Sequence, residues 1–430
     1  MERIVRIGQR LRNDALLRHS LLLLAAAQVV NAANLLFQWG MMRGLPEAEY
    51  GAMMTVLSAA LALAVPLEAL RAAVGRQVAR MAAAGAGARA LRRAVSRWMR
   101  GLLAAAGALL AISAFARPLA SALSLDDVTL VPLAALTLAL SLLLPLYLGA
   151  LQGVEAFGWM TAAGLTYSVA RLALGAALVY GVTATAVVAV AGQALGGLLA
   201  AAVGCLAWRT AAARFADRGE AAASPVERAD SGYFLRALVV LALFGALMNA
   251  DVPLAKLFFA PAAAGAFARA GTIARAVVFL PMPIAIAVFP KIVARARDPS
   301  VRRALEVRAW LLTAALIGGA TAGAWFLGGW LWRLFVGYGP TPGELRTIRM
   351  LALAMAPLGG IYLQVNVLLA RGAWRRGLWM APAVLGYLLA VRWRHAAPDD
   401  IALALGLASA AALAALTLFH RTAPRGVAAE

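Results

Sequence analysis

The sequence is poor in charged residues and almost free of cysteine. Charged side chains make up 14% of its 430 residues, whereas soluble domains carry about 25%. The single cysteine, Cys205, excludes a disulfide framework, and His19, His395 and His420 lie too far apart in the chain to suggest a metal site. The chain also lacks a P-loop, a GxSxG nucleophile motif and an HExxH zinc motif. We therefore predict that the protein is not an enzyme, and we expect no catalytic residue, metal ion or cofactor.

Apolar residues are what the sequence has in excess. They make up 63% of the chain, and the mean hydropathy is +0.81. A soluble globule of this composition has too few polar groups to cover its surface, because ordinary domains are only about 45–50% apolar. We therefore expect the excess apolar surface to face lipid, in spans of about 20 residues each.

The apolar runs predict an all-α, polytopic membrane protein with about 12 transmembrane helices. Short hinges rich in proline, glycine or charge separate the runs, as in the GPTPG segment at 339–343. The longest loops, 71–100 and 209–236, are too short to fold into a catalytic domain. The predicted helices lie near 19–41, 50–70, 101–120, 128–150, 158–181, 185–208, 234–258, 262–290, 309–332, 346–370, 375–391 and 400–420.

Positive charge dominates the polar residues. The chain has 40 Lys and Arg against 19 Asp and Glu, which gives a formal net charge of +21. These basic residues form short clusters between apolar runs, a pattern that indicates contact with anionic membrane lipids and not with nucleic acid. With the N-terminus in the cytoplasm, 29 Lys and Arg lie on cytoplasmic segments, 8 lie on the opposite side and 3 lie within spans. This bias predicts that both termini are cytoplasmic.

An internal repeat relates the two halves of the chain. At an offset of 215 residues, Pro46 matches Pro261, and the VAR tripeptide at 78–80 recurs at 293–295. Six spans per half would give both halves the same orientation, so we expect two six-helix bundles related by a pseudo-two-fold axis along the membrane normal. Transporters built in this way bind substrate between the bundles. The predicted bundles are residues 1–215 and residues 216–430.

Several short motifs resemble those of the polysaccharide-precursor (Wzx-type) flippases of the MOP superfamily, which are related to the MATE exporters. The segment LPEAEYG at 45–51 resembles the family's "LGPxxYG" hairpin, although no glycine precedes Pro46. An LQG turn at 151–153 fits the family's turn after span four. MNAD at 248–251 and FPK at 289–291 resemble an Asp in span seven and the end of span eight. Together these motifs cover both halves of the chain.

This resemblance implies a function and a location. It implies translocation of an anionic, lipid-pyrophosphate-linked oligosaccharide across the bacterial inner membrane by alternating access, in the biosynthesis of cell-surface polysaccharide such as lipopolysaccharide. It leaves open whether proton or sodium movement drives the step, and whether glycan assembly proteins bind the chain. Three alternatives stay open: a MATE-like exporter of drugs or metabolites, a membrane glycan polymerase or ligase, and a non-transporting scaffold. The glycan polymerase or ligase is disfavoured, because such enzymes usually need a sizeable outer loop that presents acid and base groups. The longest outer connection here, 333–345, is about 13 residues long.

Arginines within the spans are the candidate substrate-binding residues. An ionisable side chain in hydrocarbon costs about 2.5–3.5 kcal/mol, so such residues are functional candidates by default. Arg275 lies about 13 residues into span eight, roughly 20 Å deep, and we expect it to face a cavity. Arg171 in span five either lines the cavity or extends to the interface. Arg269 either lines the cavity or forms a structural ion pair with Asp251, which lies at a similar depth.

Two amides complete the candidate site. Asn34 and Gln364 lie within predicted spans, where each either contacts sugar or joins neighbouring helices through hydrogen bonds. Because arginines outnumber acidic residues inside the spans, the predicted cavity is cationic. A cationic cavity suits a phosphate-bearing lipid better than a cationic drug, since arginine binds phosphate oxygens in a bidentate manner.

Overall fold

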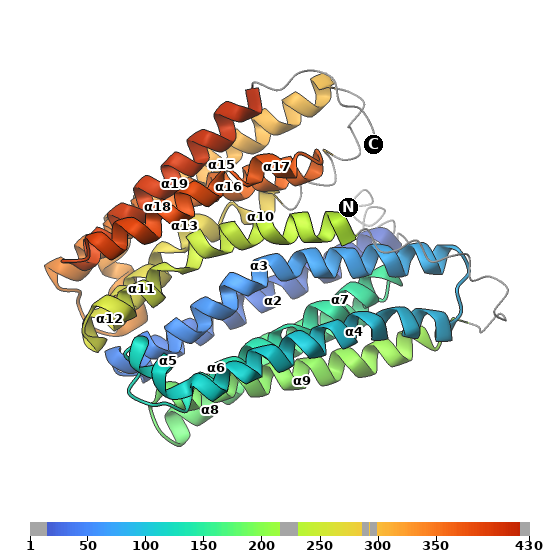
Figure 1. The fold of residues 1–430 in the computed structure, drawn as a ribbon, viewed down its shortest axis with the longest axis horizontal. Helices are drawn as coiled ribbons and strands as arrows, with labels where there is room; N and C mark the ends of the chain where they lie inside the picture. The colour runs from blue at the N-terminus through green and yellow to red at the C-terminus, as the bar shows by residue number, and fades with distance from the viewer. Residues whose placement is uncertain (1–14, 216–230, 286–291, 293–298, 422–430) are drawn as a thin grey trace, which may run out of the picture. The chain divides into compact units, whose positions relative to one another are not determined.

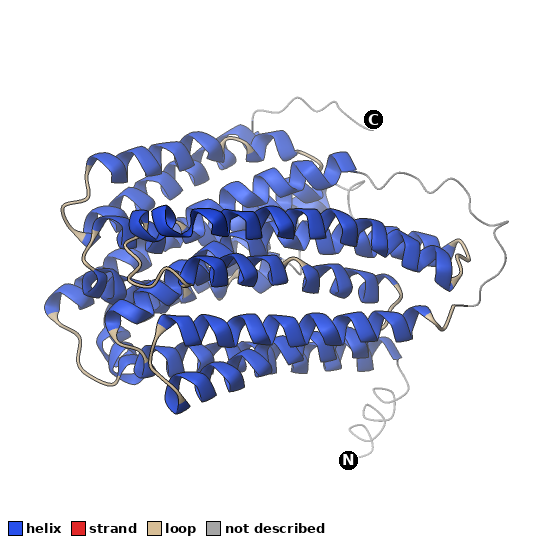
Figure 2. Ribbon diagram, turned by 60° about the horizontal axis from the view of Figure 1, so that its bottom comes forward, coloured by secondary structure: helices blue, strands red, loops and turns tan. Residues whose placement is uncertain are grey.

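The computed structural model describes residues 15–215, 231–285, 292 and 299–421 (Figure 1). Within those ranges all regular secondary structure is helical (Figure 2), which confirms the predicted all-α class. In the first half of the chain the helices are α2 (Ala15–Gly44), α3 (Glu47–Ala83), α4 (Ala88–Ala111), η1 (Ile112–Phe115), α5 (Ala116–Ala122), α6 (Leu130–Ser141), α7 (Leu143–Gly153), α8 (Phe157–Gly181) and α9 (Ala186–Ala212). In the second half they are α10 (Ser231–Asn249), α11 (Asp251–Phe258), α12 (Pro261–Ala274), α13 (Ala276–Phe279), α15 (Pro299–Val336), α16 (Pro342–Ala370), α17 (Trp374–Gly377), α18 (Met380–Trp393) and α19 (Pro398–Arg421).

The described helices have the length and composition of a multi-pass membrane protein. Nine helical stretches among the described residues, some of them made of consecutive helices, are long and apolar enough to cross a membrane, and the bent pair α10–α11 makes a tenth. Within the described residues, each of the twelve predicted spans overlaps one helix or a run of two or three consecutive helices. The FPK motif at 289–291 lies outside the described residues.

The order of the helices repeats along the chain at the predicted spacing. Helix α3 begins at Glu47 and α12 begins at Pro261, which is 214 residues later. Helix α9 begins at Ala186 and α19 begins at Pro398, which is 212 residues later. These intervals are close to the sequence offset of 215. The symmetry axis between the two halves stays a prediction.

Two compact units divide the described chain. The first comprises 15–44, 67–117, 127–215 and residue 231, and the second comprises 45–66, 118–126 and the described residues from 232 to 421. Residues 45–66 and 118–126 group with the second unit, and the division of the chain into bundles 1–215 and 216–430 stays a prediction. Helix α3 therefore contributes to both units, and it passes from one to the other at Pro66, the proline inside this helix.

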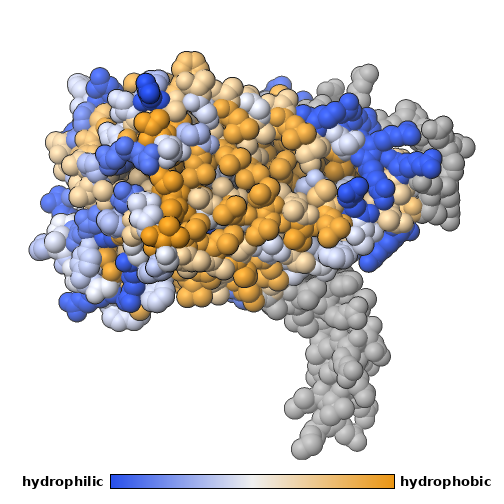
Figure 3. Space-filling view, turned by 90° about the horizontal axis from the view of Figure 1, so that it is seen from below, coloured by the Kyte–Doolittle hydropathy of each residue, from blue (hydrophilic) through white to orange (hydrophobic). Residues whose placement is uncertain are grey.

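In the first unit, α8 packs against α2 and α9, and α9 also packs against α6 and α7. Helix α9 is rich in alanine and glycine, and small side chains let helix backbones approach closely in lipid. Figure 3 shows one face of the molecule, where apolar side chains cover the middle and hydrophilic ones gather at the ends. That distribution suits a surface surrounded by hydrocarbon between two aqueous layers.

In the second unit, α16 is the central helix. It packs against α12, α15 and α19, and 72% of its most apolar stretch is buried, compared with 17% for α15. Its first turn is closed by a capping box, in which Thr341 and Glu344 satisfy each other's backbone N–H groups. Helix α16 thus supports the polar residues described below, while α15 presents most of its surface to lipid.

Two helix breaks in the second unit position charged residues. Pro253 has no N–H to donate to the Asn249 carbonyl, so the helix stops there and restarts as α11 at Asp251, bent by 47°. Arg275 lies at the second break, between the end of α12 and the start of α13. Asp251 and Arg275 therefore both occupy ends of interrupted helices.

Candidate functional site

Arg171 of α8 is the buried cation of the first unit. Its relative exposure is 8%. Helix α9 approaches it very closely, since a Cβ added at Gly196 would lie only 2.9 Å from the Arg171 backbone nitrogen. One turn earlier, a Cβ at Gly192 would lie 2.7 Å from the Cα of Gly175. These glycines bring α8 against α9 and thereby set the position of Arg171.

The guanidinium of Arg171 is held by neutral groups. Nη2 donates to Oδ1 of Asn34 over 2.9 Å. The guanidinium carbon lies 4.2 Å from the ring centre of Phe37 and 5.6 Å from that of Tyr167, which are cation–π distances. Its Nε has no hydrogen-bond partner, and Arg171 forms no ion pair with any residue that the structure describes. The charge of Arg171 is therefore fixed in place, and no carboxylate of the described residues neutralises it.

A second amide lies behind this group. Nε2 of Gln193 on α9 donates to the hydroxyl oxygen of Tyr167 over 2.5 Å, while Oε1 of Gln193 is buried without a partner. Because Tyr167 also faces Arg171, the first unit contains a connected polar cluster on α2, α8 and α9. We call Asn34, Tyr167, Arg171 and Gln193 the Arg171 cluster.

In the second unit, Asp251 pairs with Arg275 and not with Arg269. Nη2 of Arg275 donates to Oδ1 of Asp251 over 2.6 Å, and the two side chains are 3% and 0% exposed. The predicted Asp251–Arg269 ion pair is therefore wrong. That pair was predicted because Asp251 and Arg269 lie at a similar depth along their helices. Long side chains on a helix, however, extend toward the helix N-terminus, so the guanidinium lies at a different depth from its own backbone. Arg275 thus reaches back over Gly271, where an added Cβ would lie 3.2 Å from its Nη1 and 3.6 Å from Oδ2 of Asp251.

Arg269 reaches back in the same way to the start of α3. It donates to Oε1 of Glu47 over 3.1 Å, to the carbonyl of Leu45 over 2.8 Å and to the hydroxyl of Tyr338 over 2.9 Å. The glycine one turn earlier, Gly265, again provides room, since a Cβ there would lie 1.8 Å from the Glu47 carbonyl oxygen. Arg269 is therefore a structural ion-pair residue in this conformation.

Tyr338 completes the contacts of Glu47. Its hydroxyl donates to Oε1 of Glu47 over 2.5 Å. Partial burial raises the pKa of Tyr338 to about 12, and the hydrogen bond to Glu47 acts in the same direction. The phenol therefore stays protonated at neutral pH and remains a donor to the carboxylate.

The two predicted amides have different partners. Gln364 on α16 is buried, and its Nε2 donates to the Leu416 carbonyl of α19 over 3.4 Å, so it joins two helices. Asn34 lies against Arg171, as described above. The substrate-binding roles of Arg269, Arg275 and Gln364 stay predictions, and their protein contacts weaken them.

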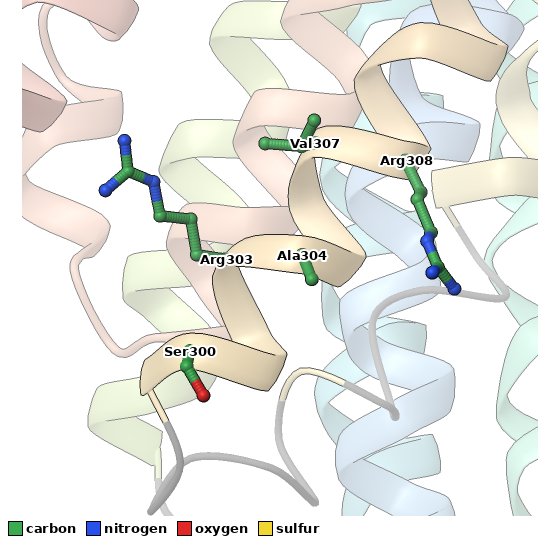
Figure 4. Close-up of a pocket in the computed structure, with 5 residues that line it drawn as sticks. All are labelled: Ser300, Arg303, Ala304, Val307 and Arg308. Atoms are coloured by element: carbon green, nitrogen blue, oxygen red, sulfur yellow. The ribbon is translucent and has the colours of Figure 1, made fainter.

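Two grooves lie in the second unit. One, of about 690 Å³, runs along the start of α15 beside Ser300, Arg303, Ala304, Val307 and Arg308. Figure 4 shows Arg303 and Arg308 leaving α15 on opposite sides, so their guanidinium groups do not converge on one ligand. The other groove, of about 520 Å³, separates α18 from α19 and is lined mainly by small apolar side chains. Neither groove contains a constellation of polar groups that could hold a metal or cofactor.

Several solved structures that are similar to this chain are transporters. An inward-facing multidrug resistance MATE family transporter of the MOP superfamily has a TM-score of 0.70 and 14% identity, over 91% of this chain and 94% of that chain. The fold is that of the MOP-superfamily transporters. Lipid II flippase MurJ in an inward closed conformation has a TM-score of 0.64 and 13% identity, over 93% and 88% of the two chains. The MATE transporter ClbM in complex with Rb⁺ has a TM-score of 0.60 and 15% identity, over 95% of each chain.

The likeness to MOP structures establishes the fold, and substrate must be argued from this chain's own side chains. No protein-family model and no curated protein matches the sequence. Tyr167, Tyr338 and Glu47 were not predicted from the sequence as partners of arginines. A usable signal was present, since a glycine precedes both Arg269 and Arg275 by four residues and opens the space that each guanidinium occupies.

Proposed function

We propose that this protein translocates an anionic lipid-linked oligosaccharide across the bacterial inner membrane by alternating access, with both termini in the cytoplasm. The MOP fold supports a transporter, and one solved neighbour is a flippase of lipid II. The substrate would supply the biosynthesis of a cell-surface polysaccharide. The observation that carries this choice is the buried guanidinium of Arg171, which no carboxylate among the described residues neutralises.

The Arg171 cluster offers hydrogen-bond donors. Oδ1 of Asn34 already accepts from Arg171, so the group left on that amide is NH₂, a donor. The oxygen of Tyr167 accepts from Gln193, which leaves its O–H as a donor. A cationic guanidinium beside further donors favours a phosphate or pyrophosphate, whose oxygens are acceptors.

The same cluster disfavours a cationic drug as cargo. A buried positive charge repels a cation strongly, because the surrounding medium screens the charge much less than water does. The buried carboxylates that would attract a cation, Asp251 and Glu306, each bind an arginine instead. A MATE-like exporter of cations is therefore the weaker alternative, and the experiment below distinguishes it.

Flipping by purified protein tests the proposal. The full chain is reconstituted in liposomes that contain a fluorescent polyisoprenyl-pyrophosphate oligosaccharide, and a membrane-impermeant reagent reports the fraction in the outer leaflet. We expect Arg171→Gln to slow flipping at least tenfold and Arg171→Lys to slow it less, because lysine keeps the charge but loses the bidentate geometry.

Arg346→Gln is the matched control. It removes one positive charge from an exposed side chain that pairs with Asp399, so its flipping rate should equal that of the wild type. Wild-type flipping by Arg171→Gln would show that this guanidinium does not bind the substrate. Export of ethidium that requires the protein and survives Arg171→Gln would instead favour the exporter.

A further inference from the structure

The second unit contains a carboxylate that is a natural candidate for a cation site. Asp251 has no exposed surface and lies at the break between α10 and α11. Its Oδ2 atom has no hydrogen-bond partner among the residues that the structure describes. One solved neighbour with this fold is in complex with Rb⁺, so the fold admits a monovalent cation. A monovalent metal cation binds to oxygen ligands, and in a protein interior it needs negative charge nearby.

The position beside this carboxylate is already occupied by a cation of the chain itself. Nη2 of Arg275 lies 2.6 Å from Oδ1 of Asp251, and an added Cβ at Gly271 would lie within 3.6 Å of both side chains. We propose that the guanidinium of Arg275 is the permanent counter-cation of Asp251, and that the protein therefore binds no exchangeable Na⁺, K⁺ or Rb⁺ at this carboxylate. This inference is independent of the substrate proposed above.

Covalent attachment makes the guanidinium a strong competitor. A tethered group binds as though it were present at a high effective concentration, which a dissolved ion must overcome. Helix α12 fixes the backbone of Arg275 one turn beyond Gly271, and the absence of a side chain at Gly271 leaves the space for the pair. A dissolved cation would have to displace a guanidinium that remains within the same buried space.

The other buried carboxylate among the described residues is arranged in the same way. Glu306 on α15 is 8% exposed and forms an ion pair with Arg371. Nε of Arg371 donates to Oε1 of Glu306 over 3.0 Å. Both buried carboxylates of the described chain are thus bound by arginines, which is the arrangement expected where dissolved cations are not ligands.

Removing the guanidinium should convert the pair into a cation site. Arg275→Ala leaves a buried carboxylate beside a space the size of the lost side chain. A small cation can then replace the lost positive charge, and its binding stabilises the folded protein by an amount that rises with the logarithm of the cation concentration above the dissociation constant.

The experiment measures the unfolding midpoint of the purified full chain in NaCl, KCl or RbCl, each exchanged for choline chloride at constant ionic strength. We expect the wild-type midpoint to be the same in all four salts. We expect Arg275→Ala to have a lower midpoint in choline chloride and to recover as one of the metal cations is raised. The double variant Asp251→Asn/Arg275→Ala is the matched control, because it lacks the carboxylate and should show no such recovery.

Two results would overturn the proposal. The first is a cation effect on the wild type that is lost in Asp251→Asn/Arg275→Gln, seen either as an unfolding midpoint that depends on a metal cation or as saturable binding of ⁸⁶Rb⁺. Such an effect would place an exchangeable cation at Asp251. The other is an Arg275→Ala protein that folds but responds to no cation. If Arg275→Ala yields no folded protein, the comparison of the wild type with Asp251→Asn/Arg275→Gln decides alone.

Discussion

The close approach of α8 and α9 at Gly196 gives a quantitative prediction. An alanine Cβ at this position would lie 2.9 Å from the backbone nitrogen of Arg171 and 3.0 Å from its Cα. Ordinary contact begins at 3.4 Å, so the two helices must separate by about 0.5 Å. Both neighbouring atoms belong to the backbone and cannot rotate away, so we expect Gly196→Ala to cost about 1–3 kcal/mol of packing energy.

Gly164→Ala is the matched control for this change. Gly164 lies on α8 in the same unit, and no atom lies within 4 Å of a Cβ built there. Both substitutions gain the same helix propensity, about 1 kcal/mol, so that term cancels when the two variants are compared. The free energy of unfolding, measured in mixed micelles, should therefore be about 1–3 kcal/mol lower for Gly196→Ala than for Gly164→Ala.

The function of the two variants should also differ. Gly196→Ala displaces the backbone that carries Arg171, so the flipping rate should fall several-fold while Gly164→Ala matches the wild type. Equal stability and equal flipping for the two variants would refute the reasoning, because they would show that α8 and α9 do not meet at Gly196. A loss of stability with normal flipping would show that the position of Arg171 is not what the substrate requires.

Two further predictions concern charge. Glu306→Gln should lower the free energy of unfolding by about 1–3 kcal/mol, because it weakens the partly buried pair with Arg371, and in the double variant with Arg371→Gln the two losses should not add. Single cysteines in a Cys205→Ser background should report the topology to a membrane-impermeant maleimide added to intact cells. A cysteine at Arg89 should stay unlabelled and one at Pro340 should be labelled, whereas the reverse pattern would contradict the orientation predicted from the Lys and Arg bias.

The helices of the fold were predictable because the lipid constraint is simple. Every span must be apolar and about 20 residues long, and the hinges that separate the spans are marked by proline, glycine and charge. The break after Asn249 was not predicted, since 234–258 was expected to be one span, although Pro253 is the sequence signal for it because it cannot donate to the Asn249 carbonyl. The membership of 45–66 in the second unit was not readable, because it depends on contacts such as Gly51 against Gly265 that connect distant parts of the sequence.

The partners of the buried arginines were harder to predict. The prediction compared the depths of the backbone positions in the membrane and did not take into account the direction in which each side chain extends. Counting residues from the hairpin at 259–260 places Asp251 level with Arg269, yet the Arg269 guanidinium extends a turn toward the hairpin and reaches Glu47. The backbone of Arg275 lies deeper than that of Arg269, and its side chain extends back to the level of Asp251.

The same rule explains why both arginines follow a glycine by four residues, because any larger side chain there would occupy the space that the guanidinium needs. Arg171 follows Tyr167 at that spacing instead, and its guanidinium lies near the tyrosine ring. Arg269 and Arg275, which reach carboxylates, thus follow a glycine at this spacing, whereas Arg171, which pairs with no carboxylate among the described residues, follows a tyrosine.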